Sequence, residues 1–242
     1  RAADRLILLN GADRGFAIGR GWKSDADIDL VPHGVSSRFL ADVPPPDRPR
    51  GRGILFCGTW DLMKGVHYLS AAYSTFVRRG GRTPLTILGG AMPAETILSS
   101  FSADARPHVT VVDRLPEEDV IAAYRSHDVL VLPSSYEGFG MVVLEAMSQR
   151  LPVIATPVGC ASLLIQHDQT GVIVPTRDAD ALAAAFERLL GDAALRARLA
   201  EAALARVAGM TWTRTAEATL TSYARARKLA IPNPQSAIRN PQ

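Results

Sequence analysis

The stretch DVLVLPSSYEGFGMVVLEAM (residues 128–147) joins a short apolar run to a glycine-containing turn and then to an apolar segment. An apolar run without polar alternation is typical of a strand that is covered on both faces, as in a parallel sheet. Gly138 and Gly140 allow the backbone to turn tightly, and we expect a helix to begin near Phe139 or Gly140. The stretch therefore predicts a strand, a loop and a helix in immediate succession.

Similar apolar runs recur on both sides of this unit. They are GILFCG (53–58), PLTILGG (84–90), HVTVVD (108–113), LPVIAT (151–156) and GVIVP (171–175). Helix candidates lie between them. Residues 65–81 end on a glycine pair typical of a helix stop, and residues 116–127 open with Pro116 in the first turn, followed by acids that suit the positive end of a helix dipole. Strands alternating with helices predict a Rossmann-like, doubly wound parallel α/β sheet with right-handed crossovers.

The ends of the chain differ from this middle. LILLN (6–10) and IDLVP (28–32) read as strands around a helix, and PPPDRPRGRG (44–53) has the composition of a linker. Near the end, Trp212, Leu220 and Tyr223 recur at helical spacing. In chain order we predict the tail of an N-terminal domain (1–28), a hinge and linker (29–52), the main domain (53–190), C-terminal helices (191–228) and a disordered tail (229–242).

Residues 134–147 have the chemistry of a binding site if this fold is correct. In an open parallel sheet, ligands bind outside the carboxyl ends of the strands. Backbone N–H groups at the glycines and at the start of the helix suit a diphosphate. Glu145, about one and a half turns into that helix, would accept hydrogen bonds from ribose hydroxyls, and Glu137 from a second sugar. The same residues also fit an exposed loop and an ordinary helix, which periodicity alone favours.

The segment EGFGMVVLE, from Glu137 to Glu145, resembles the E-x7-E signature of retaining glycosyltransferases of family four. These enzymes have two Rossmann-like domains, the B-type fold, and include glycogen-synthase-like and mannosyltransferase-like members. The similarity extends to KGVHYLSAAY (64–73), VPHGVSSRF (31–39) and TGVIVP (170–175), and covers roughly residues 6–228. In such an enzyme this chain would be the C-terminal half, which binds the nucleotide-sugar donor, and its last helix would cross back to the N-terminal domain.

The resemblance implies a role for each residue of the motif. Glu137 would contact the transferred sugar, Glu145 the ribose and Lys64 the donor phosphates. The catalytic candidates are Glu137 and Lys64, and the donor-binding candidates are Gly58, Thr59, Lys64, Leu115 (near the base), Glu137, Gly138, Phe139, Gly140, Met141 and Glu145. Transfer would occur on one face of the sugar with retention of configuration. N–H donors and a lysine stabilise the leaving diphosphate, so we expect no cofactor and no obligatory metal.

The chain departs from the family pattern at three places. Thr59 follows Gly58 where an arginine is usual, and a hydroxyl cannot replace a bidentate cation. His33 stands in place of an asparagine, and residues 159–163 read GCASL in place of Gly-Gly-x-Pro-Glu. The family's catalytic histidine and acceptor site belong to the N-terminal domain, and none of the five histidines here matches that histidine. We therefore expect this chain to bind donor without transferring sugar, and its last helix to expose an apolar face.

Two other functions fit parts of the sequence. Thr59 also suits a non-catalytic nucleotide-sugar-binding module or a partner subunit. A dinucleotide-dependent oxidoreductase would need G-x-G-x-x-G after the strand at 53–58, where the chain reads TWDLMKG (59–65), so this class ranks last.

Composition limits the partners and the compartment. The apolar share is 47%, the charged share 21% and the net charge +3, and no apolar run is long enough to cross a bilayer. Cys57 and Cys160 give neither a disulfide framework nor a metal-ligand spacing, so a reducing, cytoplasmic compartment is expected. Arginines concentrate in the last quarter. They suit a solvated helix face, which we favour, or peripheral contact with an anionic membrane, and no aromatic-interleaved stripe supports nucleic-acid binding.

Overall fold

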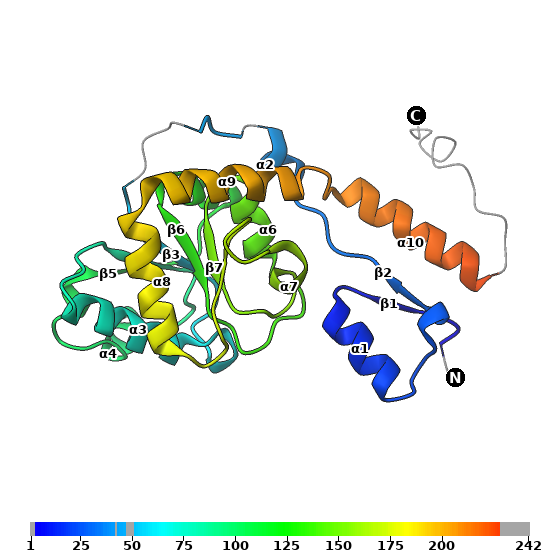
Figure 1. Ribbon diagram of the computed structural model, residues 1–242, viewed down its shortest axis with the longest axis horizontal. Coiled ribbons are helices and arrows are strands. Elements are labelled where there is room, and N and C mark those ends of the chain that lie inside the picture. The colour runs from blue at the N-terminus through cyan, green and yellow to red at the C-terminus, as the bar shows by residue number, and fades with distance from the viewer. Residues whose placement is uncertain (1–2, 42, 47–50, 228–242) are drawn as a thin grey trace.

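The computed structural model describes residues 3–41, 43–46 and 51–227. Figure 1 shows a large α/β unit on one side and a small unit on the other, with the helix α10 (Trp212–Ala226) leading from the first toward the second. The predicted tail at 229–242 and part of the predicted linker lie outside the described residues.

The large unit contains a six-stranded sheet in the order β5-β4-β3-β6-β7-β8, in which every pair is parallel. Its strands are β3 (Ile54–Cys57), β4 (Leu85–Leu88), β5 (Val109–Val112), β6 (Val129–Leu132), β7 (Val153–Ala155) and β8 (Val172–Ile173). Ile54 pairs with Leu85 on one side and Val129 on the other. The chain therefore builds outward from β3 in both directions, which confirms the predicted doubly wound sheet.

Helices cover both faces of this sheet. One face carries α3 (Val66–Arg78), α4 (Ala94–Ser99) and α8 (Ala179–Gly191), and the other carries α2 (Ser37–Ala41), α5 (Glu117–Ser126), α6 (Met141–Ser148) and α7 (Ala161–Leu164). The helix α9 (Ala193–Val207) contributes to both cores. Successive strand residues point to opposite faces, so Ile54 and Phe56 enter the first core while Leu55 enters the second. Both faces are buried, which explains why the strands read as continuous apolar runs.

Helix boundaries follow the sequence signals with one difference. The helix α3 ends at Arg78, just before Gly80 with its φ of +99°, as the glycine pair predicts. The helix α5 begins at Glu117, one residue later than expected. Pro116 is its N-cap, with an extended ψ of 156°, and therefore precedes the first turn instead of belonging to it.

The small unit is a β-α-β arrangement. Its strands β1 (Leu6–Leu8) and β2 (Ile28–Leu30) pair in parallel around α1 (Gly11–Gly19), and a 3-10 turn, η1 (Asp25–Asp27), leads into β2. The strand β2 crosses the boundary predicted at residue 28. From β2 the chain passes to the large unit beside the start of α10, where the Val35 N–H donates to the Met210 carbonyl (3.0 Å) and the Thr215 hydroxyl to the Pro32 carbonyl (2.9 Å).

Candidate functional site

A pocket of about 860 Å³ opens at the carboxyl ends of β3 and β4 and beside the residues that follow β5. Its walls also include the start of α5 and α6. The sheet order reverses between β3 and β6, and such a switch point is where open α/β sheets bind ligands. Among the predicted donor-binding residues, Gly58, Thr59, Leu115, Met141 and Glu145 line this pocket.

Glu145 lines the pocket together with Asp113 and Glu117, and a tyrosine from another helix holds it. The Tyr124 hydroxyl on α5 donates to Glu145 Oε2 at 2.8 Å. Burial raises the pKa of Glu145, and the tyrosine hydrogen bond opposes that rise while the nearby Glu117 adds to it. Cys57, at the end of β3, also lines the pocket, and burial raises the pKa of its thiol to about 11. The pocket therefore presents a carboxylate held by a hydrogen bond, beside a thiol that is neutral at physiological pH.

Glu137 and Lys64 form an ion pair on the loops next to this pocket. Lys64 Nζ lies 2.5 Å from Glu137 Oε1, and the Ser134 hydroxyl donates to the same oxygen at 3.0 Å. Glu137 and Ser134 are buried, whereas the Lys64 side chain keeps 27% of its exposure. Thr156, after β7, donates to the Ser134 carbonyl and so supports the serine. The structure thus brings together the two catalytic candidates, which the sequence did not show to be partners.

The loop that carries Lys64 is held by Asp61 and Gly65. Asp61 accepts from the N–H groups of Met63 and Lys64 at the start of the 3-10 turn η2 (Leu62–Lys64), and from the Thr59 hydroxyl at 2.9 Å. The Thr59 hydroxyl therefore donates its hydrogen bond within its own loop. At Gly65, φ is +68°, and an added Cβ would lie 2.0 Å from the Pro133 carbonyl oxygen. The absence of a side chain at Gly65 is what lets this loop lie against the loop after β6.

The start of α6 faces the same space. Gly140 is its N-cap with a φ of +87°, and no side chain of the described residues caps this helix. Free N–H groups at a helix start attract anions. An added Cβ at Gly138 would meet nothing within 4 Å, so its surroundings are open, while its carbonyl accepts from the Asn10 side chain at 3.1 Å.

Phe139 joins this loop to the hinge. Its ring lies 5.0 Å from the His33 ring, and His33 lies 5.1 Å from the Trp212 ring, measured between centroids. Trp212 also lines the pocket. His33 thus serves as an aromatic spacer between the glycine loop and α10.

Sequence reasoning missed several residues that position the site. Tyr124, Ser134, Thr156 and Asn10 hold Glu145, Glu137 or the glycine loop through hydrogen bonds. Only Ser134 carried a local signal, because it stands three residues before Glu137 directly after the strand. The others come from separate elements, so no spacing in the sequence indicates them.

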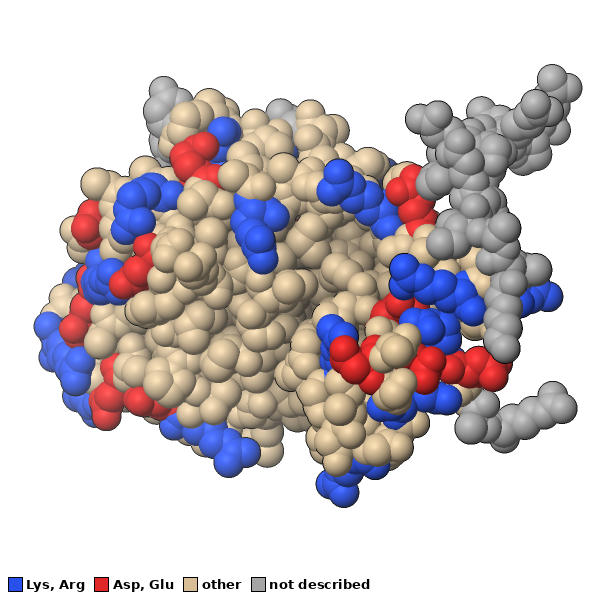
Figure 2. Space-filling view, turned by 45° about the vertical axis from the view of Figure 1, so that its right-hand side comes forward, with Lys and Arg blue, Asp and Glu red and all other residues tan. Residues whose placement is uncertain are grey.

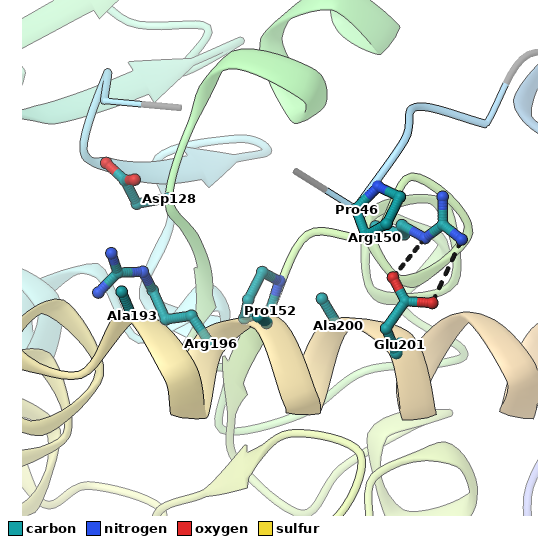
Figure 3. Close-up of a pocket in the computed structure, with 9 residues that line it drawn as sticks. Pro46, Asp128, Arg150, Pro152, Ala193, Arg196, Ala200 and Glu201 are labelled. Carbon is teal, nitrogen blue, oxygen red and sulfur yellow. Dashed lines mark hydrogen bonds and ion pairs between the residues drawn. The ribbon is translucent and has the colours of Figure 1, made fainter. Parts of the chain in front are cut away.

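A second pocket lies at the opposite edge of the sheet (Figure 3). It measures about 230 Å³ and lies between α9 and the residues that precede β6 and β7. Its charged groups make hydrogen bonds and ion pairs with other parts of the protein. Arg150 pairs with Glu201 (Nε to Oε1, 2.7 Å), Arg196 donates to the Leu189 and Leu190 carbonyls at the end of α8, and Asp128 accepts from the Gly53 N–H at 2.9 Å. This pocket shows no feature that indicates a ligand.

The basic cluster of the last quarter is largely used within the fold. Arg196, Arg198 and Arg206 donate to backbone carbonyls, and Arg225 pairs with Asp29. On the face shown in Figure 2, basic and acidic residues are interspersed and not gathered by sign. These contacts support the interpretation of the cluster as a structural, solvated face.

No helix within the described residues is long and apolar enough to cross a membrane. No group of three or more His, Cys, Asp or Glu side chains in the same part of the chain could hold a metal ion.

Fold and site together define an α/β protein with a pocket at the carboxyl edge of a doubly wound sheet. The sequence profile described as glycosyl transferases group 1 matches residues 46–206. Because that match covers more than half of the chain, the protein belongs to this family, and the resemblance noted above to family-four glycosyltransferases is confirmed.

Individual relatives agree with this assignment. The chain is 37% identical over 238 residues to a D-inositol 3-phosphate glycosyltransferase of Pseudarthrobacter chlorophenolicus, covering 91% of this chain and 56% of the relative. It is 30% identical over 209 residues to a glycogen synthase of Mycobacterium tuberculosis, covering 84% and 50%. Sucrose-phosphate synthase from Thermosynechococcus elongatus superposes with a TM-score of 0.78 at 29% identity, covering 93% and 59%. The chain thus spans about half of the length of these relatives.

Proposed function

We propose that this chain is the donor-binding half of a retaining glycosyltransferase that uses a nucleoside-diphosphate sugar. The observation that carries the proposal is the position of Glu145 in the pocket, next to the uncapped start of α6 and the Lys64–Glu137 pair. A donor of this kind combines hydroxyls, an anion and a sugar. The site offers a matching group for each within one edge of the sheet.

The donor is divided among these groups by their chemistry. The base and ribose occupy the pocket, whose wall includes Leu88, Leu115 and Val120, and Glu145 accepts hydrogen bonds from the ribose hydroxyls. The diphosphate lies at the α6 start, since carboxylates inside the pocket would repel it and helix N–H groups attract it. The sugar then reaches Glu137 on the loop before α6.

Lys64 exchanges partners in this proposal. In the structure it neutralises Glu137, and its partial exposure leaves it accessible to a second anion. The bound diphosphate attracts Lys64, and Glu137 becomes available to the hydroxyls of the sugar. This exchange needs only a small movement of a flexible side chain, because lysine is a compact charge on a flexible stem.

The reaction places its new charge where these groups lie. The bond between the anomeric carbon and the diphosphate oxygen breaks, and the electron pair stays on the diphosphate. The acceptor hydroxyl attacks the same face of the anomeric carbon and passes its proton to the departing phosphate oxygen. Lys64 and the N–H groups of α6 stabilise the growing negative charge and so lower the barrier, with no metal required in this scheme.

The acceptor is proposed to bind to a part of the protein that this chain lacks. Two relatives are named for different compounds, D-inositol 3-phosphate and glycogen, and the chain covers only 56% and 50% of them. We propose a glycan, lipid or small-molecule acceptor, and an isolated chain that binds donor without transfer. The free thiols of Cys57 and Cys160 agree with a reducing, cytoplasmic location. Peripheral membrane contact is less favoured, because Arg198 and Arg206 donate to backbone carbonyls within the protein.

Thermal unfolding with UDP, GDP, ADP and dTDP, each with and without Mg²⁺, tests the proposal. A ligand at a hundred times its dissociation constant adds about 2.7 kcal/mol, roughly 5–10 °C for a chain of this size. We expect a shift with one base, independent of the metal, that Glu145→Gln reduces. Glu118→Gln, an exposed neighbour on α5, is the matched control. A folded chain that responds to none of the nucleotides would contradict the donor site.

A non-catalytic nucleotide-sugar-binding module is the second candidate. Thr59 favours it, because its hydroxyl is bonded to Asp61 and adds no cation to the pocket. Protein that includes the missing half decides between the two. Donor binding without transfer or hydrolysis in that longer protein would support the module, and sugar transfer would exclude it.

A further inference from the structure

We propose that Tyr124 is a positioning residue for donor recognition, which acts by holding the Glu145 carboxylate in its orientation toward the bound ribose. This role rests on the proposed function. Tyr124 does not line the pocket, whereas Glu145 does, so the tyrosine acts on a ligand only through the glutamate.

The position of the tyrosine is fixed by packing. Its side chain is fully buried, with 0% exposure, and its ring lies 6.0 Å from the Phe39 ring. Its hydroxyl reaches Glu145 Oε2 at 2.8 Å and so links α5 to α6. A buried phenol must find an acceptor, because leaving its hydroxyl unsatisfied is costly. The chain supplies that acceptor at the carboxylate that faces the ligand.

This contact does two things for ribose recognition. It takes up one acceptor site of Glu145 Oε2, which leaves both acceptor sites of Oε1 for the ligand, and it restricts the side-chain rotamers of a flexible residue. It also stabilises the ionised form, since a hydrogen bond to the charged form favours that form. An ionised carboxylate accepts from hydroxyls on both oxygens, whereas a protonated one has less capacity to accept.

The groups around Glu145 determine how this contact appears in a pH profile. The nearby Glu117 raises the pKa of Glu145, and two further charged groups, Asp113 and Arg114, line the same pocket. The thiols of Cys57 and Cys160, whose pKa values burial raises to about 11 and about 12, stay neutral below pH 9. Burial raises the pKa of Glu145 and Tyr124 opposes this, so loss of the tyrosine hydroxyl raises that pKa further. Donor binding needs the ionised form of Glu145. As the pH is lowered, the affinity of a variant without the tyrosine hydroxyl therefore begins to fall at a higher pH than the affinity of the wild type.

Tyr124→Phe tests the inference with Tyr73→Phe as matched control. Tyr73 is equally buried, and its hydroxyl donates to the Thr83 and His108 carbonyls away from the pocket. Calorimetry measures the affinity for UDP, GDP and ADP between pH 5 and 8. Because this contact orients the carboxylate and keeps it ionised, we expect Tyr124→Phe to weaken binding about tenfold at pH 7. In Tyr124→Phe the fall in affinity at acidic pH, the acid limb of the profile, moves to higher pH. Tyr73→Phe keeps the pH profile of the wild type.

Two further measurements separate positioning from general destabilisation. With 2′,3′-dideoxy nucleotides, the difference in affinity between Tyr124→Phe and the wild type shrinks, because the ribose hydroxyls that donate to Glu145 are absent. Glu145→Gln removes the acid limb altogether. If the wild type binds a nucleotide and folded Tyr124→Phe has a parallel pH profile, the role of Tyr124 is refuted and the donor site stands. If none of the three nucleotides binds the folded wild type, the donor site and the role of Tyr124 fail together.

Discussion

At the scale of single residues, Gly65 supports the most demanding close contact near the site. An added Cβ would lie 2.0 Å from the Pro133 carbonyl oxygen, at a backbone φ of +68°. We expect Gly65→Ala to lower the free energy of unfolding by about 3 kcal/mol or more, since backbone strain and a clash with a strand end act together. Urea denaturation of the variant and the wild type measures this loss in the free energy of unfolding.

Gly89 is the matched control for this substitution. Its φ is +76°, but nothing lies within 4 Å of an added Cβ. Gly89→Ala should therefore show the conformational cost alone, about 1–2 kcal/mol. Equal losses for both variants would show that the contact with Pro133 contributes nothing.

Thr59 supplies a second test at this scale. It lines the pocket, where the family usually has an arginine, and its hydroxyl is bonded to Asp61. A charge-assisted hydrogen bond contributes about 1.5–3 kcal/mol, so Thr59→Arg should tighten nucleoside-diphosphate binding about tenfold, and less at high salt. Thr59→Gln removes the same hydroxyl without adding charge and should not tighten it. If calorimetry gives the two variants the same affinity for the nucleoside diphosphate, the prediction that its phosphates lie within reach of residue 59 is contradicted.

The sequence indicated the ligand-facing residues of the site but not their supports. Glu137, Glu145 and Lys64 lie in or beside recognisable motifs, and their roles stay predictions. The pairing of Lys64 with Glu137 joins residues on different loops, and Tyr124 reaches Glu145 from another helix. Such contacts depend on the register of packed elements, which local pattern does not encode.

At the scale of elements, the apolar runs predicted every strand of the large sheet, because strands buried on both faces need continuous apolar side chains. The start of α5 differs from its predicted position by one residue. Proline fixes φ but not ψ, so Pro116 is equally suited to the N-cap, where the structure has it. Thr59 shows a similar limit: its place among the donor-binding residues stays a prediction, and the hydrogen bond from its hydroxyl to Asp61 was not indicated by the sequence.

The attachment of α10 to the small unit gives a pH prediction. Asp29 on β2 accepts from Arg5 Nε (2.8 Å), Ser222 Oγ (2.7 Å) and Arg225 Nη1 (2.8 Å). The Arg5 hydrogen bond lowers the pKa of Asp29 to about 2, against the effect of burial and with help from Ser222 and Arg225. A lowered pKa adds stability that is complete above the ordinary value of 3.8 and is lost as pH falls through about 2.

Asp29→Asn should therefore be less stable than the wild type at neutral pH. The difference in the free energy of unfolding should stay constant above pH 4 and shrink between pH 4 and 2. Denaturation curves across this range measure it, with Asp4→Asn, at an exposed position, as control. A constant difference down to pH 2 would show that the contribution of Asp29 does not depend on its charge.

At the scale of the whole molecule, several large apolar side chains are exposed on both the last helix and the small unit. The sequence predicted an exposed face on the last helix, and the structure confirms it, with Trp212 at 47%, Leu220 at 55% and Tyr223 at 57% exposure. In the small unit, Phe16 and Trp22 are exposed as well, at 53% and 61%. Open apolar faces of this kind favour association.

We therefore expect the isolated chain to self-associate, with a mass by light scattering that rises with concentration. Leu220→Gln with Tyr223→Gln should lower that association, because these side chains lie on the open face of α10 and not in either core. Leu62→Gln with Met63→Gln is the matched control, since those residues are also exposed, at 73% and 60%, but lie in the 3-10 turn η2 beside the site. A constant monomer mass at every concentration would contradict the prediction. Equal effects of both pairs would mean that general hydrophobicity, and not the α10 face, drives the contact.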